Sequence, residues 1–521
     1  MRLTPFRPSG HRARLAAGCV AGLLAACASP PPAPDANVAS GADAACAALI
    51  GAMDAAVERA GTGDGGRARV RGFRTLRVDR LLASYAHPPM DAERFGGWVD
   101  AMRALDRDAR AVELANLPAE VRARLGETSR ALPGGTVADD TLAGRVDACA
   151  ERVLALDLAV PHGRAWLVAN ATVPDDYRDA WRALGLYPLT GFALALGVRL
   201  YERDTLEAFA RAGDPPRGTI VVHRPSRANA MAPDAIRRTV ASMVAAESLP
   251  PLARVDAAAL DALFASHAPD FAIDTAGPDD LPGHPLRRAD GVPDVDPARP
   301  VVFVRLAWTR FDGALLPQLV YTVWFAQRPP RFAGDPLAGR LDGLVWRVTL
   351  DRDGAPLAFD TIHPCGCYHQ FVPTARLASR PSEPTVEEGA LVVQSLPELA
   401  AGTRVRLDLE SGTHYLRRVT PLDSPAGAAA AAAAAGANAY TLEPEASLRT
   451  LPDGKGGSAS LFGANGIVAG TERPERHALW ISGIESPGAM RQWGRHATAF
   501  VGRRHFDDAF LLERYFARAG K

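Results

Sequence analysis

The hydrophobic pattern of the chain changes near residue 215, and this change constrains the fold more than any other feature. Before this point, apolar residues recur every three or four positions, which is the spacing of helices that bury one face. After it, β-branched and aromatic residues alternate with polar ones in short runs, which is typical of strands. The sequence therefore predicts an α+β fold, in which a helical domain spans residues 43–215 and a mainly antiparallel, β-sheet-rich domain spans residues 216–521.

Individual elements follow from the same periodicities. The clearest amphipathic helices are predicted at Ala45–Val57, Trp98–Leu114 and Val146–Leu158. The clearest strands are predicted at Thr219–His223, Val301–Trp308, Leu319–Phe325, Leu344–Leu350, Thr403–Leu409 and His414–Thr420. A further strand at Leu357 and Phe359 should return after a turn at Asp353 and Gly354. Residues 424–439, which include eight consecutive alanines, are expected to form a solvated loop or a short helix between two strands.

Asp175 and Asp176 follow Pro174 directly before a predicted helix. The positive end of a helix dipole favours carboxylates at this position, so we expect the two acids to stabilise the start of that helix. A catalytic acid pair is the alternative.

The N-terminus has the parts of a bacterial lipoprotein signal. Four arginines accompany an apolar segment, Leu15–Ala26, which is shorter than the roughly twenty residues that a membrane-spanning helix needs. The segment ends in Leu24, Ala25 and Ala26, directly before Cys27. We therefore expect residues 1–26 to be removed and Cys27 to carry acyl chains such as palmitate. An ordinary secretory signal cleaved near Ala26 is the alternative.

The residue after Cys27 is alanine rather than aspartate, which by resemblance to other lipoproteins implies the outer membrane. Residues 27–42 contain four prolines and predict a stiff tether, so the folded part should face the periplasm. Without residues 1–26 the chain keeps 55 basic and 59 acidic residues, a formal charge of −4 that gives no sign of nucleic-acid binding. The partners that we expect are the membrane, through the lipid anchor, and an envelope protein or a small anionic ligand.

Four other cysteines remain in the mature chain, which permits three disulfide pairings in an oxidising compartment. Cys46 and Cys149 both lie in predicted helices, whereas Cys365 and Cys367 lie two residues apart in the sheet-rich half. The sequence therefore predicts a disulfide between Cys46 and Cys149. For a loop of about one hundred residues, it would stabilise the fold by about 3 to 5 kcal/mol.

The segment from His363 to His369 is the densest cluster of potential metal ligands in the chain. His363, Cys365, Cys367 and His369 alternate with other residues directly after a predicted strand. In an extended segment these donors would span roughly 20 Å, but the proline and glycine between them favour a bend. A bent segment could present two or three donors to a divalent transition metal such as zinc, or to copper.

Two other interpretations of this segment remain open. Cys365 and Cys367 could form a strained disulfide that is readily reduced. The segment could also be a structural turn whose side chains only pack and form hydrogen bonds. Its spacing matches no zinc-finger or haem-attachment pattern.

A second cluster lies near the C-terminus, where residues 491–505 contain no acid. Its basic residues are Arg491, Arg495, Arg503, Arg504, His496 and His505. The arginines could bind an anionic group, and the histidines could complete the metal site. Internal pairing of Arg503 and Arg504 with nearby acids such as Asp507 is the alternative.

Six segments carry a wider resemblance. They are Leu76–Ser84, Val173–Tyr177, Gly185–Thr190, Leu341–Leu350, His363–His369 and Met490–Asp508. Through these segments the chain resembles an uncharacterised family of proteobacterial proteins, described as hypothetical proteins or putative lipoproteins. The family has no established activity or catalytic residue, so the resemblance implies membership alone. One departure is Arg74, where similar chains tend to carry an aromatic residue.

Together these observations predict an outer-membrane lipoprotein that faces the periplasm and has a binding or interaction role. The alternative is a metal-dependent periplasmic enzyme with its site at residues 363–369 and 491–508. Convergence of these two segments on one cavity would favour a ligand binder or an enzyme. Wide separation, with internally paired arginines, would favour a scaffold.

Overall fold

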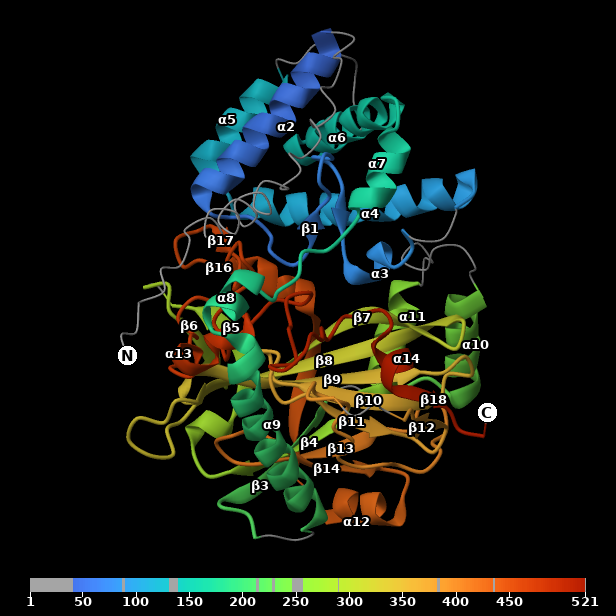
Figure 1. Ribbon diagram of the computed structural model, residues 1–521, viewed down its shortest axis with the longest axis vertical. Coiled ribbons are helices and arrows are strands. Elements are labelled where there is room, and N and C mark those ends of the chain that lie inside the picture. The colour runs from blue at the N-terminus through green and yellow to red at the C-terminus, as the bar shows by residue number, and fades with distance from the viewer. Residues whose placement is uncertain are drawn as a thin grey trace, which may run out of the picture.

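The computed structural model describes residues 41–86, 90–130, 139–211, 215–226, 230–245, 256–288, 290–381, 385–433 and 436–520. It has an α+β fold, with helices at one end and a large mixed sheet below them (Figure 1). The predicted signal peptide, Cys27 and almost all of the predicted tether lie outside the described residues. No helix in the described ranges is both long and apolar enough to cross a membrane.

The N-terminal part of the described chain is mainly helical. In chain order its elements are α2 (Gly41–Ala60), β1 (Ala68–Arg69), β2 (Arg77–Val78), α3 (Arg80–Ala83), α4 (Ala92–Asn116), α5 (Ala119–Arg130), α6 (Leu142–Ala159), α7 (Gly163–Asn170), α8 (Asp179–Leu184) and α9 (Tyr187–Ala210). The three predicted amphipathic helices correspond to α2, α4 and α6. Their apolar faces pack together, and buried Trp98 of α4 donates a hydrogen bond from Nε1 to the carbonyl of Leu82 at 2.9 Å.

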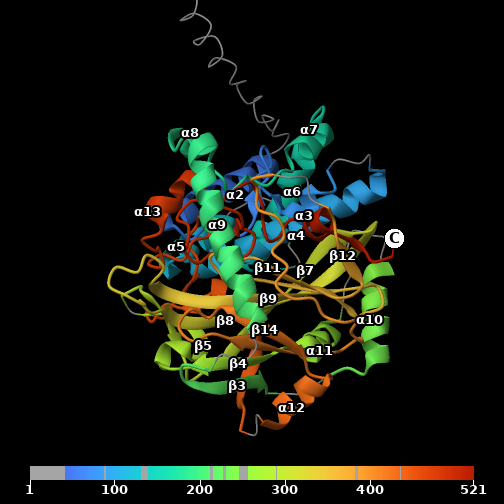
Figure 2. The same ribbon diagram turned by 60° about the horizontal axis from the view of Figure 1, so that its bottom comes forward.

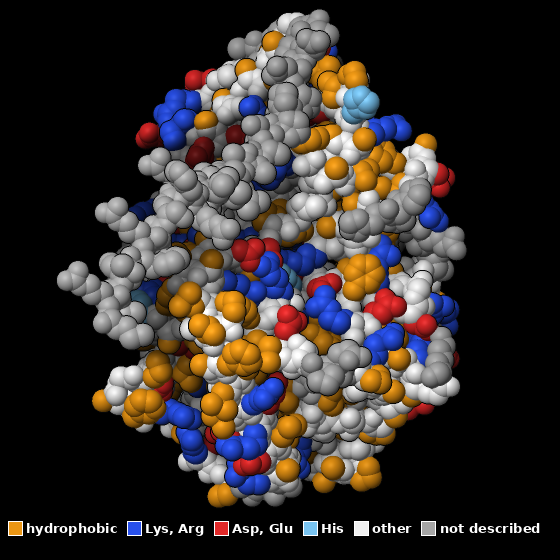
Figure 3. Space-filling model, viewed as in Figure 1, with side chains coloured by type: hydrophobic (Ala, Val, Ile, Leu, Met, Phe, Trp, Pro, Cys, Tyr) orange, Lys and Arg blue, Asp and Glu red, His pale blue; other side chains and the backbone are white. Residues whose placement is uncertain are grey.

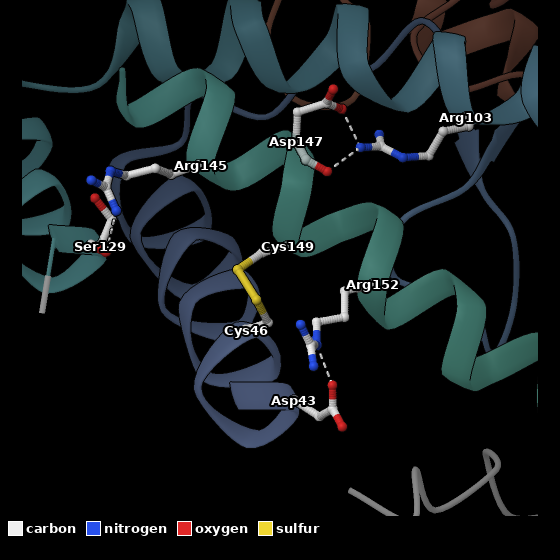
Figure 4. The surroundings of a disulfide bond; sticks show 8 residues. All are labelled: Asp43, Cys46, Arg103, Ser129, Arg145, Asp147, Cys149 and Arg152. Atoms are coloured by element: carbon white, nitrogen blue, oxygen red, sulfur yellow. Dashed lines mark hydrogen bonds and ion pairs between the residues drawn. A yellow bond between two sulfur atoms is a disulfide. The ribbon is translucent and has the colours of Figure 1, made fainter. Parts of the chain in front are cut away.

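A disulfide joins the first and third of these predicted helices. Cys46 of α2 and Cys149 of α6 are bonded, as the sequence predicts, with their Cα atoms 4.8 Å apart (Figure 4). An ion pair between Arg152 and Asp43 links the same two helices. Because the cysteines are separated by 103 residues, the bond closes a long loop of the unfolded chain.

A twelve-stranded sheet dominates the remaining described residues. Its strand order is β11-β10-β9-β8-β7-β15-β3-β4-β13-β14, with β5 beside β8 and β6 beside β5. The strands are β3 (Thr219–Pro225), β4 (Asp270–Thr275), β5 (Pro282–Arg287), β6 (Pro293–Asp296), β7 (Val301–Phe311), β8 (Ala314–Arg328), β9 (Gly339–Leu350), β10 (Pro356–Ile362), β11 (Gln370–Pro373), β13 (Val405–Leu409), β14 (Leu416–Pro421) and β15 (Asn438–Pro444). All six strands predicted above are present.

Shorter elements surround this sheet. The small strands are β12 (Leu377–Ser379), which pairs with β18 (Phe516–Arg518), and β16 (Leu451–Pro452), which pairs with β17 (Ser458–Ala459). The α-helices are α10 (Pro233–Ala245), α11 (Ala257–His267), α12 (Pro425–Ala433), α13 (Arg476–Leu479) and α14 (Leu511–Tyr515). Three 3-10 turns are η2 (Pro278–Asp280), η3 (Glu445–Arg449) and η4 (Trp480–Ser482).

Most neighbouring strands in the sheet are antiparallel, as the sequence predicts. Parallel pairs occur where β15 lies between β7 and β3, and where β13 lies beside β4. A parallel neighbour requires a crossover connection. The alanine-rich segment, which forms the short helix α12, is part of the connection that brings the chain from β14 to β15.

The main core lies on one face of the sheet. Trp346, Val348 and Leu350 of β9 share this face with Phe359 of β10, and Gly354 turns the chain between the two strands with a φ of 76°. Helices α10 and α11 supply further buried residues to the same cluster. The sequence analysis assigned no helix to this part of the chain, because the short periodic segments of α10 and α11 lie among strand signals.

Helices predominate before the predicted boundary at residue 215, and strands predominate after it. The boundary does not separate two groups of elements that pack independently. Helices α8 and α9 lie against the sheet and the C-terminal segment (Figures 1 and 2). Arg182 of α8 donates to the carbonyl of Gly502 at 2.7 Å, and Tyr201 of α9 accepts from Gln370 Nε2 at 3.1 Å. We therefore call α2–α7 the helical region and the described residues from α8 onward the sheet region.

Ion pairs join these two regions. Arg80 of α3 contacts Asp507 at 2.9 Å, and Arg449 of η3 contacts Asp64 at 3.1 Å. Both Arg449 and Asp64 are almost completely buried. The regions therefore share a partly desolvated polar interface rather than an exposed linker.

Candidate functional site

The His363–His369 loop is a tight turn between β10 and β11. The backbone amide of Gly366 donates to the carbonyl of His363 at 2.8 Å, and that of His363 donates to the carbonyl of Cys367 at 3.0 Å. Gly366 has a φ of 89°, and a Cβ atom added there would lie 2.5 Å from the carbonyl oxygen of Ala497. Only glycine fits such a position without a shift of the backbone.

The C-terminal segment holds this loop from the other side. The backbone amide of Arg491 donates to the carbonyl of Pro364 at 2.8 Å, and His496 Nε2 lies 3.1 Å from the same oxygen. The Arg491 side chain donates from Nε to the carbonyl of Cys365 at 3.3 Å. The two clusters that the sequence analysis selected are therefore in direct contact.

The loop does not gather its histidines and cysteines around one point. His363 Nδ1 lies 3.0 Å from Asp342 Oδ1, whereas His369 Nε2 lies 2.9 Å from Asp360 Oδ2. Asp342 lies an even number of residues from the core residue Trp346 on β9, so the two side chains point to the same face of the sheet. Asp360 of β10 pairs with Arg347, which points to the other face. Since side chains alternate between the faces of a sheet, the two imidazoles are held toward opposite faces.

The proposed metal centre is therefore not assembled. His496 contacts a backbone carbonyl, and His505 Nε2 lies 3.3 Å from Asp176. Within the described ranges, no group of three or more histidine, cysteine or acidic side chains is arranged to hold a metal ion. The six predicted ligands, His363, Cys365, Cys367, His369, His496 and His505, are thus not gathered around one point in this structure.

The four arginines of the C-terminal cluster are all occupied within the protein. Arg495 contacts Asp176 at 3.2 Å, and Arg503 pairs with Asp175 and Asp179. Arg504 donates to the carbonyl of Gly389 at 2.6 Å and lies 3.4 Å from Glu388, while Arg491 binds carbonyl oxygens. Each of the four thus has acid or carbonyl partners among the described residues.

This pairing also changes the roles of two acids. Asp175 and Asp176 do not cap α8, because the residue at its N-terminal cap is Arg178. Instead they contact Arg503, Arg495 and Arg80. The internal pairing that the sequence analysis considered is present, but its acids come from far upstream rather than from residues 507–513.

A cavity of about 410 Å³ lies where the loop, the C-terminal segment and α9 meet. Its volume is within the range of small-molecule sites. Apolar side chains form much of its wall, among them Leu194, Val198, Leu391, Leu479, Ile484 and Phe500. The polar groups in the wall are Tyr201, Glu202, Cys365, Cys367, Tyr368, His369, Glu388, Tyr415, Glu475, Thr498 and Arg504.

The two cysteines of the loop lie next to each other in this wall. Neither is in a disulfide, and both are buried. The backbone amide of Cys367 donates to Cys365 Sγ at 3.4 Å. Burial raises the pKa of a thiol, but a hydrogen bond from Cys367 and the charge of Arg473 outweigh it and lower the pKa of Cys365. The hydrogen bond between Cys367 and Cys365, together with burial, raises the pKa of Cys367.

A buried polar network, centred on Asp342 of β9, contacts the loop through His363. Asp342 accepts from both His363 and His414, at 3.0 and 2.9 Å, and lies 3.3 Å from Arg473. Burial opposes the ionised form of Asp342, but His363 and Arg473 hold its pKa well below the ordinary value. His414 also contacts Asp280 at 3.4 Å.

Apart from His363, the residues of this network were not selected from the sequence, and neither were several residues of the cavity wall. Asp342 lies within a segment that carries the family resemblance, but its partners are 21, 72 and 131 positions away. Glu388, Glu475 and Tyr201 are isolated in the sequence. No local pattern could have brought them together.

The outer face of α9 is also apolar. The exposed large hydrophobic residues of α8, α9 and their junction are Leu184, Leu186, Leu189, Phe192, Leu196, Leu200 and Leu206. Figure 3 shows hydrophobic side chains gathered on the face where α8 and α9 lie in Figure 1. A contiguous exposed apolar surface is typical of contact with other apolar molecules. Helix α9 thus has apolar side chains both toward the cavity and toward solvent.

Comparisons with known proteins identify no relative of this chain. No family model, no curated protein and no solved structure matches the chain.

Proposed function

We propose that the protein binds a small, largely apolar molecule in the cavity beneath α9. The observation that carries the proposal is the cavity itself, which is large enough for such a molecule and mainly apolar, with a few polar groups at fixed positions. Because the C-terminal arginines are paired internally, a neutral or weakly charged ligand fits this wall better than the anionic ligand first expected.

The binding role fits the envelope location that the sequence predicts. A lipid anchor on Cys27 would hold the folded part near a membrane, where apolar molecules concentrate. Fatty-acid labelling tests this part of the proposal: label should enter the wild-type protein and be lost in Cys27→Ser. Label that persists in Cys27→Ser would contradict acylation at this cysteine.

Cavity binding can be tested with the fluorescent apolar probe N-phenyl-1-naphthylamine. Gly197 of α9 and Gly389 both line the cavity, and a Cβ atom added at either would meet no other atom within 4 Å. Leucine at these positions should therefore occupy part of the cavity without displacing the backbone. We expect Gly197→Leu and Gly389→Leu each to weaken probe binding about tenfold, which corresponds to about 1.4 kcal/mol.

Gly96→Leu is the matched control for Gly197→Leu. Gly96 lies inside α4, a Cβ atom added there also meets no atom within 4 Å, and it does not line the cavity. Both substitutions raise helix propensity by a similar amount. Equal binding of the probe by all three variants and the wild type would contradict the proposed site.

A further inference from the structure

The cavity wall contains two adjacent thiols whose environments differ. Cys365 and Cys367 are 3% and 8% exposed, and they are the cysteines of the described chain that have no disulfide partner. The turn at Gly366 brings them together, and the contact of Gly366 with Ala497 fixes this turn. A pair of thiols held rigidly in the wall of a ligand cavity is suited to chemistry on the ligand.

We propose that Cys365 and Cys367 form a thiol–disulfide exchange site whose substrate is a small apolar disulfide bound in the cavity. This inference rests on the proposed function, because it requires that the cavity admit an apolar ligand. It assigns an activity to the site and a chemical class to the ligand.

Cys365 is the attacking thiol. Its sulfur accepts the backbone amide of Cys367, and the charge of Arg473 favours its thiolate form. Arg473 is fully buried, and its Nε and Nη1 atoms have no hydrogen-bond partner. A buried guanidinium whose charge acts on a thiol stabilises negative charge on its sulfur.

Cys367 is the resolving thiol, and Glu475 accepts its proton. The carboxyl group of Glu475 lines the same cavity and acts electrostatically on both thiols. Its Oε1 atom is buried without a hydrogen-bond partner, and burial raises the pKa of Glu475 above the ordinary value. A buried carboxylate with a raised pKa is a better proton acceptor than an exposed one.

The reaction has two balanced steps. The Cys365 thiolate attacks one sulfur of the ligand disulfide, whose S–S bond breaks, so that a mixed disulfide forms and one ligand thiolate leaves. Glu475 then takes the proton of Cys367, and the Cys367 thiolate attacks Cys365 Sγ. The second ligand sulfur leaves and receives that proton from Glu475. Overall the two cysteines are oxidised to a disulfide, and the ligand disulfide is reduced to one thiol and one thiolate.

The experiment uses 4,4′-dithiodipyridine, a small aromatic disulfide that releases a coloured thione, with the purified acylated protein, in which Cys365 and Cys367 are reduced and the Cys46–Cys149 disulfide is intact. Wild type should release about two thiones per protein and end with a disulfide between Cys365 and Cys367, without an adduct. Cys367→Ser should release about one thione and retain a pyridyl adduct on Cys365. Cys365→Ser should react about tenfold more slowly, because burial still raises the pKa of the remaining thiol after the hydrogen bond with Cys365 is lost.

Glu475→Gln separates proton transfer from a structural role. We expect the first thione to be released at the wild-type rate and the second about tenfold more slowly, because glutamine cannot accept the proton. Equal slowing of both releases would contradict the assignment of Glu475. Stable pyridyl adducts on both cysteines of the wild type, or no reaction at Cys365, would overturn the exchange site.

Failure of this inference can be distinguished from failure of the proposed function. The Cys365→Ser/Cys367→Ser variant has no exchange chemistry but keeps the cavity, so it should still bind N-phenyl-1-naphthylamine. Probe binding without exchange in the wild type would overturn the inference and leave the proposed function intact. Exchange that Gly197→Leu does not slow would show that the thiols react without use of the cavity, and would overturn the inference.

Discussion

The helical region and the sheet region each enclose one carboxylate that solvent does not reach, and they surround it with different cations. In the helical region Asp106 lies 2.7 Å from Arg110, 3.4 Å from Arg77 and 3.6 Å from Arg103. In the sheet region the corresponding residue is Asp342, which contacts two histidines and one arginine. Both carboxylates have no exposed surface.

The cations around Asp106 have other partners. Arg77 also contacts Glu113 at 2.5 Å, and Arg110 also contacts Asp54 at 3.1 Å. Guanidinium groups keep their charge at any pH at which a protein folds. The cations of this cluster are therefore redundant and keep their charge as the pH changes.

The cations around Asp342 are less redundant. His414 has a second carboxylate in Asp280, but Arg473 otherwise donates to the carbonyl of Leu341, and His363 has no second acid among its described contacts. Imidazoles also gain and lose protons near neutral pH. The comparison suggests that the sheet region, which carries the cavity, depends more on a single carboxylate and on pH.

The largest effect should come from Asp342→Asn. Loss of this charge removes the carboxylate that forms an ion pair with Arg473, and breaking a buried pair typically costs about 3 to 5 kcal/mol. We expect regional hydrogen exchange, followed by mass spectrometry, to show this loss in peptides from β9 and the His363–His369 loop. Asp106→Asn is the matched control, and it should cost less because Arg77 and Arg110 keep their other acids. Equal losses of stability in the two variants would contradict the claim that the sheet region depends more on a single carboxylate.

A loss of about 4 kcal/mol should follow from Cys46→Ala/Cys149→Ala, because the bond closes a long loop in the unfolded chain. The loss should be confined to the helical region, where both cysteines lie. Hydrogen exchange in peptides from α2 and α6 should increase, while probe binding in the cavity should stay unchanged. A loss of probe binding would show that the two regions fold as one unit.

Acid should destabilise the sheet region through its buried histidines. Burial lowers the pKa of His267, His369 and His496 to about 4, below the ordinary value of 6.5. The unfolded chain therefore binds protons more readily between these pH values, and stability falls as the pH falls from about 6.5 to about 4. We expect His267 alone to contribute a loss of about 3 kcal/mol, measured by urea unfolding. His267→Gln should reduce this pH dependence, and an unchanged slope would contradict the assignment.

The smallest effect concerns Asp157 of α6 and has the opposite sign. Burial raises its pKa to about 6, so the folded chain binds this proton more tightly than the unfolded chain does. The carboxyl group therefore destabilises the helical region as the pH rises from about 4 to about 6. After a discount for partial contact with solvent, Asp157→Asn should stabilise this region by about 1 kcal/mol at pH 7. The gain should disappear at pH 4, and a gain at both pH values would show another cause.

The pattern of side chains along the chain predicted much of the fold. Helices α2, α4 and α6 and the strands from β7 to β10 were assigned from periodicity, because one buried face imposes a period of 3.6 or 2 residues. The cysteine pair 46 and 149 followed from the placement of cysteines in predicted helices. Elements α10, α11 and β4 were missed, because their segments are short and lie among signals of another kind.

The site was predicted only in part. The loop at 363–369 and the segment at 491–505 were selected for their composition, and they do meet at one cavity. The metal site was not assembled, because Asp342 and Asp360 hold the two loop histidines toward opposite faces of the sheet. The arginines at 503 and 504 were expected to pair with acids nearby, but their acids come from before α8 and after β12.

Sequence by itself determined the local features of this protein: the helical half, the strands, the turn at Gly354 and the adjacency of Cys365 and Cys367. These depend on contacts between residues a few positions apart, which leave a periodic or compositional trace. Only the tertiary structure decided how the environments of the two thiols differ, which carboxylate each histidine contacts and where the cavity lies. Those contacts join residues up to hundreds of positions apart, and burial, which sets their energies, exists only once the chain has packed.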